Sequence, residues 1–145
     1  MPKKIDHIAI AVRSLAEGEA LLNALGFTCE RQELIEEQGV RVAFFDVAGV
    51  HVELLEPLSA EGPIRRFLGD RLAVVHHLAF ASNDIEAEMA ALQAKGMRFI
   101  DPEPRNGSRG KRIAFIHPKS SASLLIELCQ DVAVEQPKVV APEIT

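Results

Sequence analysis

The chain has 145 residues, 48% of them hydrophobic and 26% charged, which predicts a single globular domain and excludes a disordered or fibrous chain. Its 16 basic and 21 acidic residues give a net charge of −5, and Trp and Tyr are absent, so no nucleic-acid partner is expected. The apolar runs are too short to cross a bilayer and no apolar signal segment is found, so we expect a cytoplasmic protein with no membrane partner.

Two halves of the chain repeat one another in the same order. Residues 6–12 recur as 76–82, residues 41–45 recur as 112–116, and residues 50–54 recur as 124–128. The spacing between the copies only grows along the chain, as small loop insertions in a duplicated module would produce. Chance similarity of short apolar strands is the weaker explanation, because the order is kept throughout.

The first repeat, residues 5–56, reads as a strand, a helix and three further strands. Residues 5–12 alternate in polarity with the period of a strand. A helix follows, with Ser14 and Glu17 in a capping-box pattern and Gly26 at its end. Its apolar stripe consists of Leu15, Leu22 and Leu25. Further strands are predicted for residues 27–34, 40–47 and 50–56.

The second repeat, residues 75–130, follows the same scheme. Its helix is predicted to begin with Asn83 as the cap and Glu86 three residues later, and to end at Gly96. The apolar stripe consists of Ile85, Met89 and Leu92. Further strands are predicted for residues 97–100, 112–117 and 123–129.

The segments outside the repeats are a connector and a tail. Connector 57–74 contains Pro and Gly, and a short helix is predicted at Ile64–Leu68. Residues 131–145 lack periodicity and are predicted to form a flexible tail. The chain is therefore predicted to be one α+β domain, in which two tandem βαβββ modules form a cupped mixed sheet with helices on its outer face.

Strand alternation predicts where one histidine of each repeat points. The branched residues of 5–12 should face the helix, which places His7 on the opposite face with two alanines. His77 has the same parity, and two alanines lie beside it as well. Small residues next to a histidine in both strands indicate a cavity on that face. His76 has the other parity and is interpreted as structural.

Two carboxylates recur in the same way. Glu53 and Glu127 each lie between strongly apolar strand neighbours, where an ionised carboxylate is costly unless it is paired or binds a metal. Imidazole and carboxylate ligands suit a borderline divalent ion such as Zn²⁺, Co²⁺, Ni²⁺ or Mn²⁺. Each residue taken alone is more often a solvated or hydrogen-bonded side chain, but the match between repeats favours a shared site. Cys29 and Cys129 are expected to be free thiols outside it.

The chain resembles the vicinal-oxygen-chelate (glyoxalase-like) superfamily over about residues 5–130 and, within it, the methylmalonyl-CoA epimerase family. The paired βαβββ pattern is shared by the whole superfamily. His76-His-Leu-Ala-Phe80 is one of the segments that carry the resemblance. The combination of Glu37-Gln-Gly-Val40, Glu56-Pro-Leu58 and His117-Pro-Lys-Ser120 is more specific to the epimerase family.

This resemblance implies a metal site and a reaction. The implied ligands are His7, Glu53, His77 and Glu127, with Gln in place of Glu53 in some family members. The implied activity interconverts (R)- and (S)-methylmalonyl-CoA by removing and returning the α-proton through a metal-stabilised enolate. Glu127 resembles a proposed base of the family. Some members carry a second Glu where this chain has Val42, so the second acid or base is not identified.

A cluster of cations supports an anionic substrate. Residues 105–119 contain five Lys or Arg residues and no acidic residue. Arg109, Lys111 and Lys119 are therefore candidates for holding the phosphates of an acyl-CoA, with Lys119 the strongest. A solvated charged loop is an equally good explanation of this cluster. The resemblance and the number of expected strand edges also predict a homodimer.

Three other functions remain open. A lactoylglutathione lyase would use the same four ligands on a glutathione adduct. An extradiol dioxygenase would need two His and one carboxylate, and Glu53 argues against it. A non-catalytic small-molecule-binding protein would have little reason to keep two matched His/Glu pairs.

Overall fold

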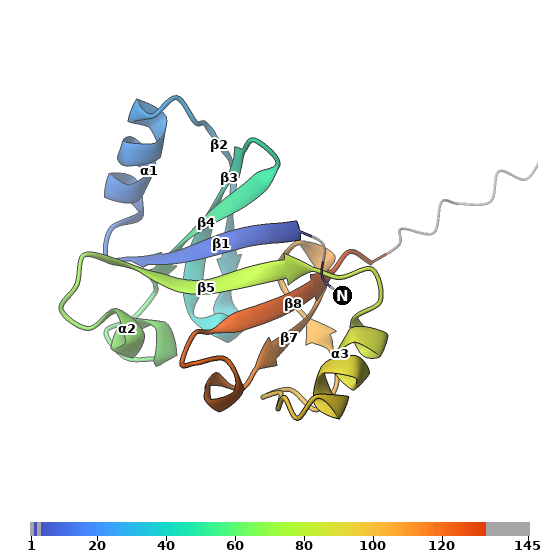
Figure 1. Cartoon of the computed structure of the whole chain (residues 1–145). Coiled ribbons are helices and arrows are strands. Elements are labelled where there is room, and N and C mark those ends of the chain that lie inside the picture. The colour runs from blue at the N-terminus through green and yellow to red at the C-terminus, as the bar shows by residue number, and fades with distance from the viewer. Residues whose placement is uncertain (1, 3, 133–145) are drawn as a thin grey trace, which may run out of the picture.

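The computed structural model describes residues 2 and 4–132, and their strands form one eight-stranded mixed sheet (Figure 1). The first module contains β1 (Lys4–Val12), α1 (Leu15–Ala24), β2 (Cys29–Ile35), β3 (Val40–Val47) and β4 (Val50–Pro57). The second contains β5 (Ala73–Ala81), α3 (Ile85–Ala94), β6 (Arg105–Asn106), β7 (Arg112–Ile116) and β8 (Ile126–Gln130), and α2 (Pro63–Leu68) lies in the connector. The predicted α+β architecture of two βαβββ modules is confirmed.

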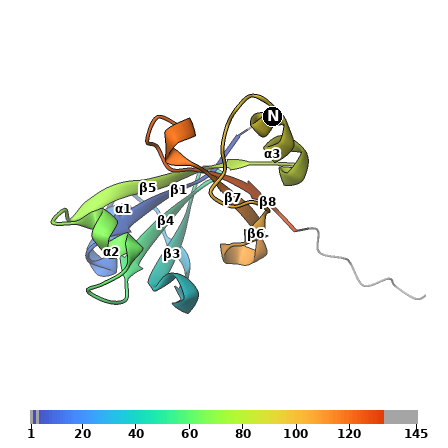
Figure 2. The same ribbon diagram turned by 90° about the horizontal axis from the view of Figure 1, so that it is seen from below.

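The two modules occupy the two halves of the sheet, with equivalent strands at equivalent distances from its centre. The strand order is β2-β3-β4-β1-β5-β8-β7-β6. β1 is parallel to β4 and β5 is parallel to β8, while β1 and β5 pair antiparallel. In this central pair Ile8 lies opposite Leu78. The modules are therefore related by an approximate twofold axis through the β1–β5 pair, and the sheet curls away on both sides of it (Figure 2).

The outer face of the sheet carries the main apolar packing. The cluster beneath α1 includes Val12, Phe45 and Leu54, and the cluster between α3 and the sheet includes Ile85 of α3 and Leu128 of β8. A third cluster lies on the inner face and consists of Ala9, Val40, Val42, Phe44 and Leu55, with Ile64 of α2 against it. The predicted strand parity is thus confirmed for the regular part of β1, and the histidine face is the inner one.

Phe45→Ala is expected to lower the free energy of unfolding by about 3–5 kcal/mol, because a fully buried aromatic ring leaves a cavity when it is truncated. Phe45 is 0% exposed, within the cluster beneath α1. Urea denaturation checks the result against Leu21→Ala, a truncation on α1 at a side chain that is 63% exposed. An equal loss in the two variants would contradict the assignment of the core.

Several predicted details of the elements are wrong. α3 is capped by Asp84, whose side chain accepts a hydrogen bond from the Ala87 backbone N–H, and not by Asn83. Leu25 follows the end of α1 and is 63% exposed, so it is no part of the buried stripe. The strand predicted at 97–100 is reduced to a bridge between Phe99 and Ile116, and the prolines that follow cannot donate hydrogen bonds to extend it.

Asp84→Ala is expected to cost about 1 kcal/mol of stability, because the first turn of α3 loses its side-chain cap. The Asp84 carboxylate accepts from Ala87 N at 3.0 Å. Asn83→Ala serves as the matched control at the neighbouring position, and thermal unfolding compares the two. A larger loss from Asn83→Ala would show that the cap is misassigned.

Three further sequence expectations concern membrane-spanning segments, the cysteines and the tail. Within residues 2 and 4–132, no helix is long and apolar enough to cross a membrane. Cys29 and Cys129 are both free thiols. Of the predicted flexible tail, residues 133–145 lie outside the described part of the chain.

Candidate functional site

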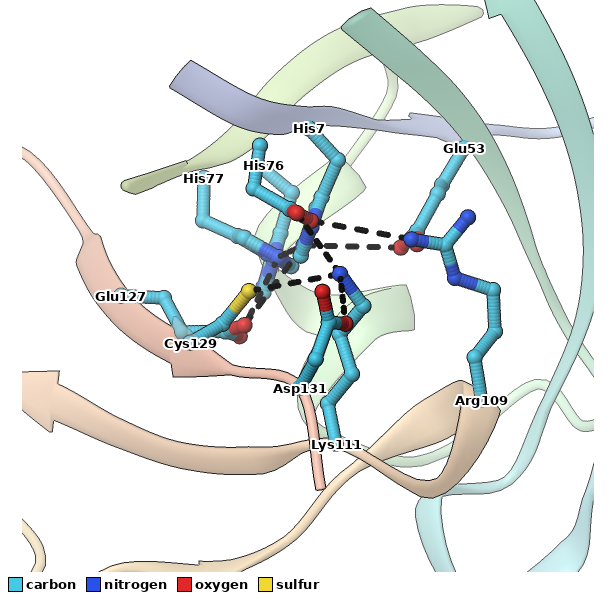
Figure 3. Close-up of polar contacts among 10 residues, drawn as sticks. His7, Glu53, His76, His77, Arg109, Lys111, Glu127, Cys129 and Asp131 are labelled. Carbon is cyan, nitrogen blue, oxygen red and sulfur yellow. Dashed lines mark hydrogen bonds and ion pairs between the residues drawn. The ribbon is translucent and has the colours of Figure 1, made fainter. Parts of the chain in front are cut away.

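The two histidines with matching parity meet on the inner face at the centre of the sheet (Figure 3). Because β1 and β5 are antiparallel, His7 lies opposite Ala79 and His77 lies opposite Ala9. The alanines leave room for the two rings, whose Nε2 atoms are 3.1 Å apart. His7 is 3% exposed and His77 is 9% exposed, so both rings are buried in the middle of the domain.

Glu53 and Glu127 reach the same point from the flanking strands β4 and β8. Glu53 is in register with Ala9 and Glu127 with Ala79, which are equivalent positions in the two modules. An oxygen of Glu53 lies 3.6 Å from His7 Nε2, and the two oxygens of Glu127 lie 3.6 and 3.5 Å from the Nε2 atoms of the two histidines. The structure therefore brings together all four candidate ligands.

Burial governs the protonation of this cluster. Desolvation raises the pKa of Glu127 to about 7, although His7 opposes the shift, and Glu53 adds to it. Burial also raises the pKa of Glu53 and lowers the pKa of His77 to about 2, with His7 and His76 contributing. His77 is consequently neutral, with a lone pair available to a ligand, while two carboxylates stand in a site that disfavours negative charge.

The donor set fits a divalent cation. One ligand atom each from His7, Glu53 and His77 lies within 4.8 Å of the others, and donors about 2.1 Å from a common ion stand roughly 3–3.5 Å apart. Glu53 Oε1 is buried without a hydrogen-bond partner among the described residues. A cation would satisfy this oxygen and offset the charge of both carboxylates.

The cluster opens into a cavity of about 390 Å³. One wall comes from the first module, with Val40, Val42 and Leu55, and the other from the second, with Ile113, Phe115 and Leu125. Val42 is 1% exposed, so this wall offers no acid or base at the position where some family members have Glu. The cavity can enclose a small acyl group between apolar walls beside four polar side chains.

The three candidate cations lie in different surroundings. Lys111 is 8% exposed, and its Nζ donates to Asp6 at 2.6 Å, so the structure does not support direct contact between Lys111 and phosphate. The Arg109 guanidinium lies above the Phe44 ring, 5.6 Å from its centroid, and 3.7 Å from Asp6. Lys119 is exposed on the 3-10 turn Pro118–Ser120, after β7.

Sequence reasoning missed two residues of the site. His76 lines the cavity, and its Nδ1 lies 2.8 Å from Nδ1 of His77, so the predicted orientation of His76 toward the other face is wrong. Asp6 accepts a hydrogen bond from His7 Nδ1 at 2.7 Å. Both residues lie at irregularities in the β1–β5 pairing, where parity no longer holds. Their shared position, one residue before each histidine, was the available signal.

Comparison with known proteins shows the family of the chain. Residues 6–115 match the glyoxalase/bleomycin resistance protein/dioxygenase superfamily. The chain is 41% identical to an uncharacterised Bacillus subtilis protein, YqjC, with 88% of this chain and 91% of that protein covered. It is 35% identical to the mitochondrial methylmalonyl-CoA epimerase of Dictyostelium discoideum, with 86% of this chain and 76% of that protein covered.

A solved structure shows the same fold. A variant of the Streptomyces coelicolor methylmalonyl-CoA epimerase, in complex with 2-nitronate-propionyl-CoA, superposes with a TM-score of 0.82 at 37% identity. The match covers 92% of this chain and 100% of the Streptomyces chain. The fold and the sequence thus have counterparts in one class of protein. The chain belongs to the glyoxalase/bleomycin resistance protein/dioxygenase superfamily and, within it, to the methylmalonyl-CoA epimerase family.

Proposed function

We propose that the chain is a metal-dependent epimerase that interconverts (R)- and (S)-methylmalonyl-CoA. The observation that carries this proposal is the convergence of two His/Glu pairs, one from each module, at the end of an apolar cavity. The family relationship supports the same substrate, because a similar methylmalonyl-CoA epimerase was solved in complex with methylmalonyl-CoA and the Streptomyces protein in complex with 2-nitronate-propionyl-CoA. The acyl-CoA is therefore the expected small-molecule partner.

The residues that would hold the ion are His7, Glu53, His77 and Glu127. A divalent ion held there would act as a Lewis acid on the thioester carbonyl, which makes the neighbouring α-proton more acidic. The two apolar walls would exclude water from the carbon that loses its proton. Any of Co²⁺, Zn²⁺, Ni²⁺ and Mn²⁺ is compatible with these nitrogen and oxygen donors.

Glu127 is the proposed base. Its carboxylate is buried and lines the cavity, which places a proton acceptor next to the enclosed acyl group. On the first-module wall, Val42 has no proton to exchange. A water molecule or another side chain must therefore serve the opposite face of the planar intermediate.

Lys119→Ala is expected to raise the KM for methylmalonyl-CoA about three- to tenfold with little change in kcat, because an exposed cation that holds a phosphate contributes to binding and not to the chemical step. Lys119 is exposed and follows β7, one strand of the cavity wall. Lys95→Ala, which removes an exposed lysine at the end of α3, is the matched control. An unchanged KM in Lys119→Ala would remove this residue from the substrate site.

The proposed activity is tested by following exchange of the α-proton of methylmalonyl-CoA in deuterated solvent. We expect deuterium to enter at the α-carbon and the two epimers to reach equilibrium. The hemithioacetal of methylglyoxal and glutathione serves as the comparison substrate. Its conversion to lactoylglutathione without α-exchange in methylmalonyl-CoA would replace the proposal by a lyase, and inertness toward both would favour a binding protein.

The homodimer stays a prediction, and analytical ultracentrifugation measures it directly. A mass near 31.8 kDa, twice the 15.9 kDa of one chain, is the expected result.

A further inference from the structure

Two bulges interrupt the central strand pair at equivalent places. Ile5 pairs with Phe80 and His7 pairs with Ala79, which leaves Asp6 as an extra residue in β1. Ala9 pairs with His77 and Ile10 pairs with Val75, which leaves His76 as an extra residue in β5. Each module thus carries a bulge immediately before its inward-facing histidine. A bulge redirects a side chain relative to the regular alternation of a strand.

The two redirected side chains make the same kind of contact. Asp6 Oδ2 accepts from His7 Nδ1 at 2.7 Å, and Nδ1 of His77 lies 2.8 Å from Nδ1 of His76. In both rings Nδ1 is therefore engaged by the preceding residue, while Nε2 faces the carboxylates. A ring whose Nδ1 carries the proton has its lone pair on Nε2.

We propose that Asp6 and His76 are positioning residues of the metal site, which fix the tautomer and the orientation of the histidine that follows each of them. This inference rests on the metal dependence proposed above and extends it to two residues that are not among the four candidate ligands. Hydrogen-bond partners of this kind hold a ligand ring in place before an ion arrives and increase its basicity.

Each positioning residue is itself held by a segment that lies outside the βαβββ core of its own module. Asp6 Oδ1 accepts from Lys111 Nζ at 2.6 Å, so a cation from the segment before β7 anchors the carboxylate. The ring of His76 packs edge-on against Phe67 of α2, with centroids 4.8 Å apart. The hydrogen bond from Lys111 to Asp6 gives Lys111 a role in orienting Asp6, in place of the predicted role in binding phosphate.

Asp6, His7 and Cys129 could themselves be read as a separate metal-binding group. The ammonium of Lys111 occupies that position, bonded to Asp6 and 3.9 Å from Cys129 Sγ. Asp6 therefore acts through His7.

The test measures the Kd of Co²⁺ by competition with a chromophoric chelator, together with the visible absorption spectrum of the bound Co²⁺. Asp6→Ala and His76→Phe each remove the acceptor next to Nδ1, and each is expected to raise the Kd about 10- to 100-fold and to shift the spectrum. Asp70→Asn, which alters an exposed carboxylate in the connector, is expected to keep the parent Kd.

A pair of substitutions at position 76 separates hydrogen bonding from packing. His76→Phe keeps a ring against Phe67 but removes the acceptor, whereas His76→Asn loses the ring and keeps an acceptor near the position of Nδ1. We expect His76→Asn to bind Co²⁺ within about threefold of the parent and His76→Phe to bind it far more weakly. Melting temperatures of the metal-free variants show that each one folds.

The inference is overturned if His76→Phe and Asp6→Ala bind Co²⁺ as tightly as the parent, or if His76→Asn is the weaker of the two variants at position 76. These outcomes leave the proposed function standing, provided that the parent binds Co²⁺ and His77→Ala does not. A parent chain that binds no Co²⁺ would overturn both the positioning role and the metal-dependent epimerase.

Discussion

Glu127→Gln is expected to slow exchange of the α-proton of methylmalonyl-CoA by about 10²- to 10⁴-fold, the usual contribution of a well-placed acid or base. The amide has nearly the same shape as the carboxylate and keeps an oxygen for a metal, but it cannot accept the proton. Glu127 is 3% exposed and lines the cavity, so water cannot readily replace it.

The approximate twofold symmetry of the fold supplies a matched control for this substitution. Glu53→Gln makes the same chemical change at the equivalent position of the first module. We expect it to lose much less exchange, because the family resemblance implies that Gln is tolerated there. Deuterium incorporation followed by NMR, with bound metal measured in both variants, gives the comparison. Equal losses in the two variants would contradict the assignment of Glu127 as the base.

His77→Ala is expected to remove the stabilisation that Co²⁺ gives to the parent. An ion present at a hundred times its Kd stabilises a folded protein by about 2.7 kcal/mol, whereas a site that has lost a ligand gains little. The Nε2 atom of His77 lies 3.1 Å from that of His7 and 3.5 Å from Glu127, so its loss removes a donor from the middle of the cluster.

Thermal unfolding with and without Co²⁺ measures this difference. His117→Ala is the control, because this ring accepts a hydrogen bond from the Lys119 backbone N–H at the 3-10 turn after β7 and is no part of the cluster. The parent and His117→Ala should both melt at a higher temperature when Co²⁺ is added. A similar increase in His77→Ala would place the ion elsewhere.

The central features of the site could be predicted because a duplicated strand pattern carries geometric information. Alternation in 5–12 and 76–82 placed His7 and His77 on the inner face, and the repeat placed a glutamate beside each of them. Convergence then follows from the pairing of each module's first and last strands. Local sequence and symmetry were enough at these positions.

The details that could not be predicted depend on irregular pairing or on distant contacts. The prediction assumed that successive strand residues alternate between the two faces of the sheet. The bulge at His76 interrupts this alternation, so the side chain of His76 points to the face opposite the predicted one. Lys111 finds Asp6 across 105 positions of sequence separation, and nothing in the local charge pattern distinguishes this buried partner from a solvated loop cation. Asn83 and Asp84 are both good caps, so only the backbone geometry decides between them.

Metal dependence of the proposed activity is tested most directly by α-proton exchange in methylmalonyl-CoA. The protein is stripped of metal with a chelator and then titrated with Co²⁺. Four donors from two modules converge on one point, so we predict negligible exchange in the stripped protein and a linear recovery that stops at one ion per chain. Exchange at the full rate in the stripped protein would contradict the account.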